Sequence, residues 1–271
     1  MSFSSLPQLL KGNGSAALAY GLAALPGRPR AAPVLIFAQG RSGSTVLESL
    51  LGSTGHVTAR GELLGDGHER TLFPRALLRG HARRTGGRSL LCHVKIYHLT
   101  RDRERAGSRT LDPQTFLRGL AEEGWRIIYL TRTDRVRHVL SGLVAEARNN
   151  YHKLDDRPVT TAVTVRRATL EAWIAQRRAL EQEERAALAG LDYHEVVYER
   201  DLEQAAAHQQ TIDRVLDFLD LSHRSVSTPF RKVNARPLRE IVANYDEFSK
   251  WLAEMGLESA LKDEPRAALR A

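Results

Sequence analysis

The segment from Gly40 to Thr45 has the composition of a loop that binds phosphate. It follows residues 33–38, a short apolar run typical of a strand buried on both faces, and it precedes residues 45–52, which have helical spacing. Glycine lets the backbone approach an anion closely, and the amides that open a helix point at that anion. An ordinary strand-to-helix turn with capping serines is the alternative interpretation. The candidate phosphate-binding residues of this loop are Arg41, Ser42, Gly43, Ser44 and Thr45.

The loop departs from the nucleoside-triphosphate loop G-x-x-x-x-G-K-[ST] at two positions. Ala38 replaces the first glycine, and Ser44 replaces the lysine that reaches the β- and γ-phosphates. A later strand usually ends in a metal-holding aspartate, whereas the apolar run 126–131 is followed by Arg132. An arginine repels magnesium and attracts a second anion. The sequence therefore predicts a metal-free site for a nucleotide with one 5′-phosphate group and a further phosphate.

Short apolar runs alternate along the chain with stretches of helical spacing. The expected strands are 33–38, 90–97, 126–131 and 193–198. The expected helices are 45–52, 113–123 (capped by Asp112), 134–148, 165–189, one that ends at 215–219, and 237–252. This alternation predicts an α/β fold with three layers and a mainly parallel central sheet. Ligands of such sheets bind at the carboxyl ends of the strands, so the site is expected at 39–45, 98–101 and 132–141.

The composition of the 271 residues excludes several classes of protein. Hydrophobic residues make up 42% and charged residues 27%, the balance of a folded globular chain. The longest apolar run is shorter than the ~20 residues of a membrane-spanning helix. The single cysteine, Cys92, excludes an internal disulfide and a cysteine-based zinc site.

The net charge of +8 favours an anionic partner, although a genomic base composition that favours arginine codons would also produce it. The basic residues are spread along the chain without a lysine tract or basic arm, so we expect no nucleic-acid partner. A breaker cluster at 26–30 separates an N-terminal extension, residues 1–30, from the main domain, residues 31–253, which a C-terminal tail, 254–271, follows. Residues 15–26 faintly resemble a signal peptide. We interpret them as a short amphipathic or packing helix of a cytoplasmic protein, with a peripheral membrane contact left open.

The phosphate-loop motifs resemble the sulfotransferase family, which transfers sulfonate from 3′-phosphoadenosine-5′-phosphosulfate (PAPS). The segment 41–45 is similar to the family's 5′-phosphosulfate loop. Arg132 at a strand end, with Ser141 nine residues later in the next helix, is similar to the pair that holds the 3′-phosphate in the family. The resemblance implies the sulfotransferase fold for residues 31–253, with PAPS as co-substrate, adenosine 3′,5′-bisphosphate as product and no metal.

The resemblance is closest to bacterial carbohydrate sulfotransferases of the trehalose and lipochitooligosaccharide type. It covers roughly residues 33–252, but residues 63–89 match nothing that identifies the acceptor. The implied acceptor is a small molecule or a glycan, and the implied acceptor group is a hydroxyl of a carbohydrate or glycolipid. A phenol or a peptidyl tyrosine is the alternative acceptor. The segments similar to that group are 53–55, 60–63, 94–97, 198–202 and 244–247.

The resemblance also implies roles for individual residues. Glu62 is the expected catalytic base, because related bacterial enzymes place a glutamate after the first helix. Arg41 is expected to stabilise the leaving 5′-phosphate, and Lys95 to contact the sulfonate or the bridging oxygen, unless Lys95 is only the charged end of a strand. Lys232 is expected to close over the nucleotide. The histidines that remain alternative bases are His56, His68, His93 and His98.

Assembly into a homo-oligomer remains open. Two other classes of function also remain open at this point. One is a P-loop-type nucleotide kinase or phosphotransferase, which the absent lysine at Ser44 disfavours. The other is an anion-binding or nucleic-acid-binding protein without catalysis. That class accounts for the charge but leaves the loop and the Arg132–Ser141 pair without a role.

Overall fold

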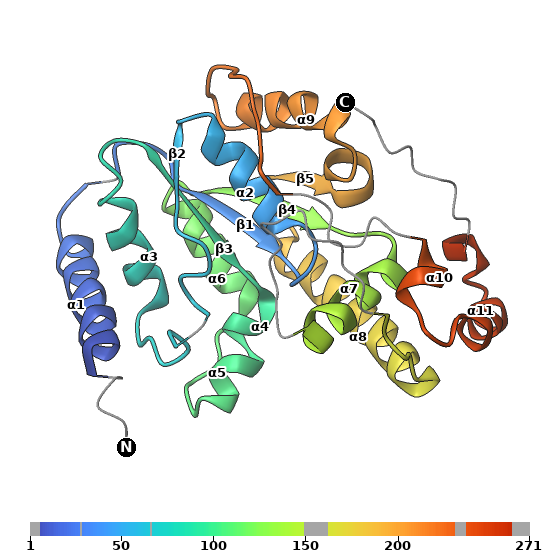
Figure 1. Cartoon of the computed structure of the whole chain (residues 1–271). Helices are drawn as coiled ribbons and strands as arrows, with labels where there is room; N and C mark the ends of the chain where they lie inside the picture. Colours follow the sequence, from blue (N-terminus) through green and yellow to red (C-terminus); the bar gives the residue numbers. More distant parts are fainter. Residues whose placement is uncertain (1–5, 28, 66, 149–161, 231–236, 262–271) are drawn as a thin grey trace.

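The computed structural model describes residues 6–27, 29–65, 67–148, 162–230 and 237–261, which form an α/β fold around one sheet. All five strands of this sheet are parallel, in the order β2-β3-β1-β4-β5 (Figure 1). The predicted α/β fold with a parallel central sheet is therefore confirmed. The strands are β1 (Val34–Ala38), β2 (Val57–Ala59), β3 (Ser89–Val94), β4 (Arg126–Thr131) and β5 (Tyr193–Val197).

Helices cover both faces of the sheet. One face packs against α2 (Ser44–Ser53) and α9 (Ala205–Phe218). The opposite face packs against α3 (Pro74–Ala82), α6 (Pro113–Glu122) and α8 (Arg167–Leu188). Figure 1 shows these two helical layers on either side of the strands.

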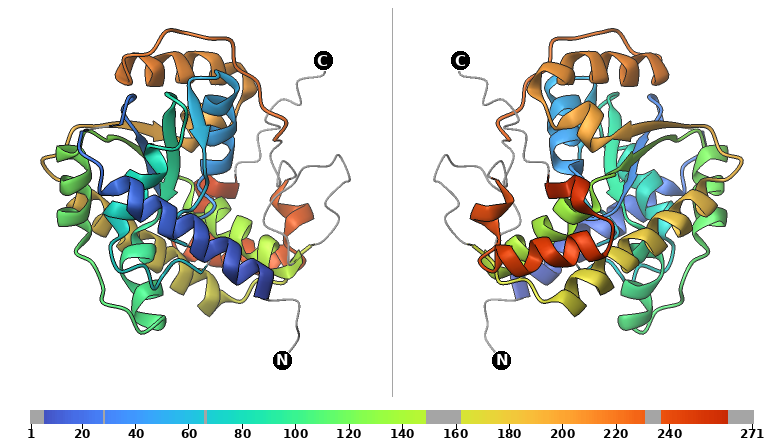
Figure 2. Two further views of the ribbon diagram at one scale, coloured as in Figure 1. Left: turned by 90° about the vertical axis from the view of Figure 1, so that its left-hand side faces the viewer. Right: turned by 90° about the vertical axis from the view of Figure 1, so that its right-hand side faces the viewer.

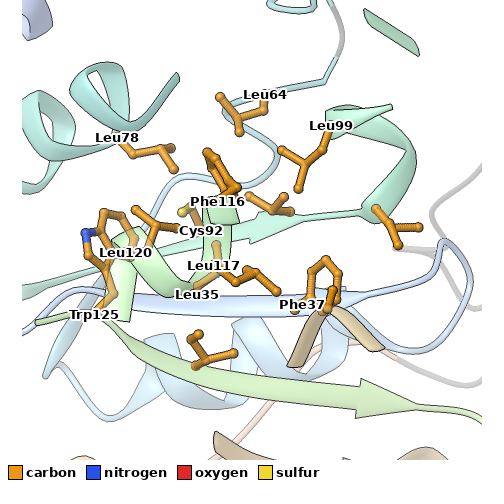
Figure 3. Packing of buried hydrophobic residues seen from close by; sticks show 14 of the residues in the cluster. Leu35, Phe37, Leu64, Leu78, Cys92, Leu99, Phe116, Leu117, Leu120 and Trp125 are labelled. Atoms are coloured by element: carbon orange, nitrogen blue, oxygen red, sulfur yellow. The ribbon is translucent and has the colours of Figure 1, made fainter. Parts of the chain in front are cut away.

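The central strand β1 is buried on both faces, as its continuous apolar run predicts. Val34 and Ile36 join the cluster with α2 and α9, whereas Leu35 and Phe37 join the cluster with α3, α6 and α8. Figure 3 shows the second cluster, in which Leu35 and Phe37 face residues of α6 such as Phe116. Burial of each such side chain contributes about 1.5–3 kcal/mol, which fixes β1 and the start of the loop after it.

A third apolar cluster joins α7 (Arg135–Arg148) and the first half of α8 to α10 (Leu238–Ile241) and α11 (Tyr245–Glu254). Figure 2 shows α10 and α11, in red, beside α7 rather than against the sheet. At the other side of the molecule, α1 (Leu6–Ala23) packs on α3, where Gly80 meets the backbone of Ala19. The remaining elements are α4 (Ile96–Leu99), α5 (Arg101–Arg105), the π-helical turn η1 (Tyr198–Leu202) and the 3-10 turn η2 (Glu258–Leu261).

Several boundaries differ from the predicted ones. The expected strand 90–97 ends at Val94, because α4 begins two residues later, at Ile96. The expected helix 237–252 is divided into α10 and α11, because Val242 leaves the helix to pair with Val163. No sequence pattern predicts β2, which has three residues, and α1 begins well before residue 15. In the described part of the chain, no helix combines the length and apolar character that a membrane span requires.

Candidate functional site

The segment after β1 forms a tight loop with two residues in the left-handed region. Arg41 has φ +68° and Gly43 has φ +100°. Alternating left-handed and right-handed residues turn successive amide groups toward one side, which creates a concave site for an anion. The Gly43 carbonyl accepts the first helical bonds, from Val46 N at 3.0 Å and Leu47 N at 3.1 Å, so the amides before Val46 lie at the open end of α2.

Side chains hold three successive carbonyl oxygens of this loop. The Gln39 oxygen accepts a hydrogen bond from Ser42 Oγ at 2.7 Å, and the Gly40 oxygen accepts one from His138 Nε2 at 2.8 Å. The Arg41 oxygen accepts from Arg132 Nη1 at 3.2 Å. In a trans peptide the carbonyl and the next N–H point in opposite directions, so these contacts turn the amides of the loop away from the donors. The N–H groups of residues 40, 41 and 42 therefore remain available to an anion.

His138 is held as a neutral donor. Burial lowers its pKa well below the usual value, and the charges of Arg177 and Arg132 act in the same direction. Because a carbonyl only accepts hydrogen bonds, Nε2 must carry the proton that it donates to Gly40. Arg177, from α8, donates to the same oxygen through Nη1 at 3.4 Å.

Gly43 lies against the ring of Tyr198, the first residue of the π-helical turn η1. A Cβ atom at Gly43 would lie 2.6 Å from Tyr198 Cδ2, inside the contact distance of any carbon pair. Its φ of +100° is also a conformation that side chains rarely adopt. The loop thus needs glycine at this position both for its backbone conformation and for the approach of Tyr198.

Arg132 and Ser141 lie beside the loop, where the sequence places a second anion site. The Arg132 guanidinium stacks on the Tyr198 ring at 4.6 Å, and its Nε contacts Glu199 Oε1 at 3.3 Å. Ser141 Oγ, on α7, accepts a hydrogen bond from Arg41 Nε at 3.2 Å. The structure therefore brings Arg41, Arg132 and Ser141 together, although the chain separates the loop from Ser141 by about a hundred residues.

Glu199 keeps Arg132 in place and caps α7 at the same time. Its Oε2 accepts from Thr133 N at 2.9 Å, and its Oε1 accepts from Asp134 N at 3.2 Å. A carboxylate at the amino end of a helix is favourable because it meets the positive end of the helix dipole. The negative charge beside Arg132 also compensates that buried guanidinium, whose side chain is 7% exposed.

A second cluster, the Glu62 cluster, lies on the other side of the loop. Lys95 Nζ is 2.5 Å from Glu62 Oε1, and His98 Nε2 is 3.2 Å from Glu62 Oε2. His98 Nδ1 accepts from Lys95 N at 3.3 Å, so the proton of this ring lies on Nε2 and points at Glu62. Lys95 follows β3, and the chain reaches Glu62 after β2, so neighbouring strands supply both residues.

The Glu62 cluster touches the phosphate loop at Gly40. A Cβ atom at Gly40 would lie 2.8 Å from Tyr97 Oη and 3.8 Å from Lys95 Nζ. Tyr97 also hydrogen-bonds to Lys95, which is thereby held between a carboxylate and a phenol at the mouth of the loop. Glycine at position 40 leaves the room that these two side chains occupy.

Charge pairing controls the protonation of this cluster. Burial raises the pKa of Glu62, but the hydrogen bond from His98 and the charge of Lys95 outweigh it and lower that pKa to about 2. Burial lowers the pKa of Lys95, yet the neighbouring Tyr97 and Glu62 raise it above its usual value. At neutral pH the pair is therefore a carboxylate and an ammonium group in contact.

Other predicted site residues have different positions. Lys232 lies outside the described residues. His93 is buried and contacts Glu48 Oε2 at 2.6 Å on α2, which gives it a partner away from Glu62. His56 Nε2 donates to the Ser222 carbonyl on the surface, at 2.9 Å. Of the histidines considered as bases, His98 is the one that we find in contact with Glu62.

Sequence reasoning missed the residues that support the loop. These are His138 and Arg177, which hold its backbone, Tyr198 and Glu199, which hold Arg132, and Tyr97, which holds Lys95. Spacing offered one signal: His138 is three residues before Ser141 and so shares its helix face. Among the described residues, no group of three or more His, Cys, Asp or Glu side chains is arranged to hold a metal ion.

Comparison with known proteins adds no relative. No model of a known protein family matches the chain, and no curated protein matches its sequence. The function is therefore inferred from the loop, the Arg132–Ser141 pair and the Glu62 cluster.

We predict that Gly43→Ala weakens binding of adenosine 3′,5′-bisphosphate, the nucleotide expected from the sequence, at least tenfold, because an alanine at this position would be strained by about 1–2 kcal/mol and would collide with Tyr198. Isothermal titration calorimetry measures the change, and the circular dichroism spectrum checks the fold. Gly52→Ala is the control, since a Cβ atom there meets nothing within 4 Å. Binding by Gly43→Ala as tight as that of the unchanged protein would contradict the described loop.

Proposed function

We propose that this protein is a sulfotransferase that moves the sulfonate group of PAPS to an acceptor hydroxyl. One observation supports this proposal more than any other. Arg132 and Ser141, on separate elements, both bond to Arg41 of the phosphate loop. A guanidinium and a hydroxyl group therefore adjoin the phosphate loop, where the second phosphate of a nucleotide with a phosphate at each side of its ribose would bind. The sulfotransferase fold is part of the proposal, and the parallel sheet with helices on both faces is compatible with it.

The donor would occupy the loop and the Arg132 site together. The amides that open α2 and the hydroxyls of Ser44 and Thr45 would bind the 5′-phosphosulfate. Arg132 and Ser141 would bind the 3′-phosphate, for which the planar guanidinium offers two parallel donors. Lys232 remains predicted to close over the nucleotide.

Sulfonate transfer needs a nucleophile, a base and a stabilised leaving group. The acceptor oxygen forms a bond to sulfur while the bond from sulfur to the 5′-phosphate oxygen breaks. The acceptor proton passes to the Glu62 carboxylate, and the electron pair of the broken bond stays on the phosphate. Loop amides and Arg41 would stabilise this added charge, and a preformed loop would need little reorganisation as the bond breaks.

Because Glu62 is paired with Lys95, it would act as a base only when this pairing weakens. A carboxylate with a pKa of about 2 accepts a proton poorly at neutral pH. Lys95 Nζ lies at the mouth of the loop, where it would also reach a sulfonate oxygen. When Lys95 contacts the donor, Glu62 loses part of its positive neighbour and its pKa rises, so donor binding would prepare the base. His98 would keep the carboxylate oriented throughout.

The proposed acceptor rests on the resemblance, and the proposed location rests on the interpretation of residues 15–26 and on the single cysteine. A carbohydrate or glycolipid hydroxyl is the proposed acceptor, a phenol or peptidyl tyrosine is the alternative, and the cytoplasm is the proposed compartment. Transfer of radiolabelled sulfonate to extracts fractionated into glycans, lipids and peptides would separate these acceptors.

We predict that adenosine 3′,5′-bisphosphate raises the melting temperature in the presence of EDTA, whereas ATP with magnesium has little effect. A hundredfold excess over the dissociation constant stabilises the folded state by about 2.7 kcal/mol. Arg132→Ala should remove most of this protection because the second phosphate loses its charged partner. Arg126→Ala, at the other end of β4 and paired with Asp220, is the control. Equal or greater protection by ATP with magnesium would instead favour a nucleotide phosphotransferase.

We predict that Glu62→Gln lowers kcat by about 10²- to 10⁴-fold and leaves the dissociation constant of adenosine 3′,5′-bisphosphate within twofold. The active form of Glu62 is the carboxylate, and its pKa is low, so the unchanged enzyme should show no Glu62-dependent loss of kcat/KM between pH 7 and 5. Glu171→Gln, an exposed change on α8, is the control. Turnover by Glu62→Gln at the rate of the unchanged enzyme would transfer the role of base to a histidine.

A further inference from the structure

A buried carboxyl group that the proposed chemistry does not use lies directly behind the phosphate loop. Glu184, on α8, is 1% exposed. Its Oε2 accepts hydrogen bonds from Gln39 Nε2 and from Tyr129 Oη, each at 3.2 Å. Gln39 is the first residue of the loop, and its own carbonyl holds Ser42. Glu184 is thus one side chain removed from the backbone that would bind the anion.

Arg177 connects the same helix to the same loop. It lies seven residues, or two helical turns, before Glu184 and so shares its face of α8. Arg177 Nη1 donates to Gln39 Oε1 and to the Gly40 carbonyl, each at 3.4 Å, while Gln39 Nε2 donates to the Arg177 carbonyl at 3.2 Å. The Gln39 amide therefore bonds to both Arg177 and Glu184 of α8, so a change at either side chain reaches the loop.

A small polar pocket separates Glu184 from the end of β4. Its volume is about 10 Å³, the space of about one water molecule. Within the described residues, four buried polar atoms of its lining have no hydrogen-bond partner: Thr131 Oγ1, Arg135 Nε, Arg177 Nε and Glu184 Oε1. An unpaired, buried carboxylate oxygen is costly, and a proton on that oxygen removes most of the cost.

The surroundings of Glu184 favour its neutral form. Burial, and to a smaller extent the charge of Glu181, raise the pKa of Glu184, and the opposing effects of Gln39, Tyr129 and Arg177 are weaker, so that this pKa is about 7. Burial also raises the pKa of Tyr129, so the phenol stays a donor to Glu184. The charged and titratable groups around Glu184 are Arg177, Glu181 and Arg185 of α8, Tyr129 of β4, Arg132 after it, and Arg135 and His138 of α7.

We propose that Glu184 is a positioning residue of the phosphate loop and that the loop binds its anion most tightly when this carboxyl group is neutral. Two effects act together. An ionised Glu184 repels the anion through a low-dielectric interior, and it also competes with the Gly40 carbonyl for Arg177. The proposal rests on the loop being the anion site proposed above, but it does not depend on which nucleotide the loop accepts.

The test is the dissociation constant of adenosine 3′,5′-bisphosphate for the full chain and for Glu184→Gln at pH 6 and pH 8.5. Glutamine has nearly the shape of the neutral carboxyl group. We expect the two proteins to bind equally at pH 6 and the unchanged protein to bind about tenfold more weakly than Glu184→Gln at pH 8.5. Protonation of the ligand itself cancels in this ratio, because both proteins meet the same ligand at each pH.

Two further measurements keep the outcomes separate. Glu183→Gln, an exposed change on the same helix, should change binding by the same factor at both pH values. Folding raises the pKa of Glu184 from 4.5 to about 7, so the neutral carboxyl group contributes its full stabilisation below pH 4.5 and loses it as the pH rises through 7. Glu184→Gln should therefore have a higher melting temperature than the unchanged protein at pH 8.5, but not below pH 4.5.

If the ratio of the dissociation constants of the unchanged protein and Glu184→Gln were the same at pH 6 and pH 8.5, the role of Glu184 would be overturned while the proposed function stands. Loss of binding by folded Glu184→Gln at both pH values would also overturn it. Absence of nucleotide binding by the unchanged protein at both pH values would instead overturn the proposed function.

Discussion

The orientation of three carbonyl groups toward buried donors, away from the open side of the loop, is the constraint on which the site depends. A loop that turned the oxygens of Gln39, Gly40 and Arg41 toward its open side would repel an anion rather than bind it. Their donors are Ser42 within the loop and His138, Arg177 and Arg132 from α7, α8 and the end of β4. The position of each of these elements is set by apolar packing on the sheet or on its neighbours. The core of the protein thus specifies the direction in which a few peptide groups point.

The strand order explains why the loop has different chemistry on its two sides. Because β1 lies between β3 and β4, the carboxyl end of β3 places Lys95 on one side and that of β4 places Arg132 on the other. The Lys95 side also receives Glu62 from beyond β2, which gives it a carboxylate. The Arg132 side receives Tyr198 and Glu199 from beyond β5, which fix a guanidinium. A donor bound over β1 would have its anionic nucleotide on one side and its reacting group on the other.

Local signals in the sequence were enough to predict the frame of this site. The apolar runs identified β1, β3, β4 and β5, and the glycines and hydroxyls after the first run identified the loop. The contacts between distant residues had no local signal. Lys95 looks like the end of a strand until the fold brings it to Glu62, and Glu184 looks like one charge in an acidic stretch of a surface helix. The helix period buries Glu184 while the neighbouring Glu183 is exposed, and only the packing of α8 on the sheet decides which of the two faces the loop.

The most direct measurement is a crystal structure of the full chain with adenosine 3′,5′-bisphosphate bound in the presence of EDTA. We expect the 5′-phosphate oxygens within hydrogen-bond distance of the amides at the start of α2, with the Gly40 carbonyl still bonded to His138. The 3′-phosphate should contact Arg132 and Ser141. A 5′-phosphate bound elsewhere, or a loop whose carbonyl oxygens turn toward the ligand, would contradict the account.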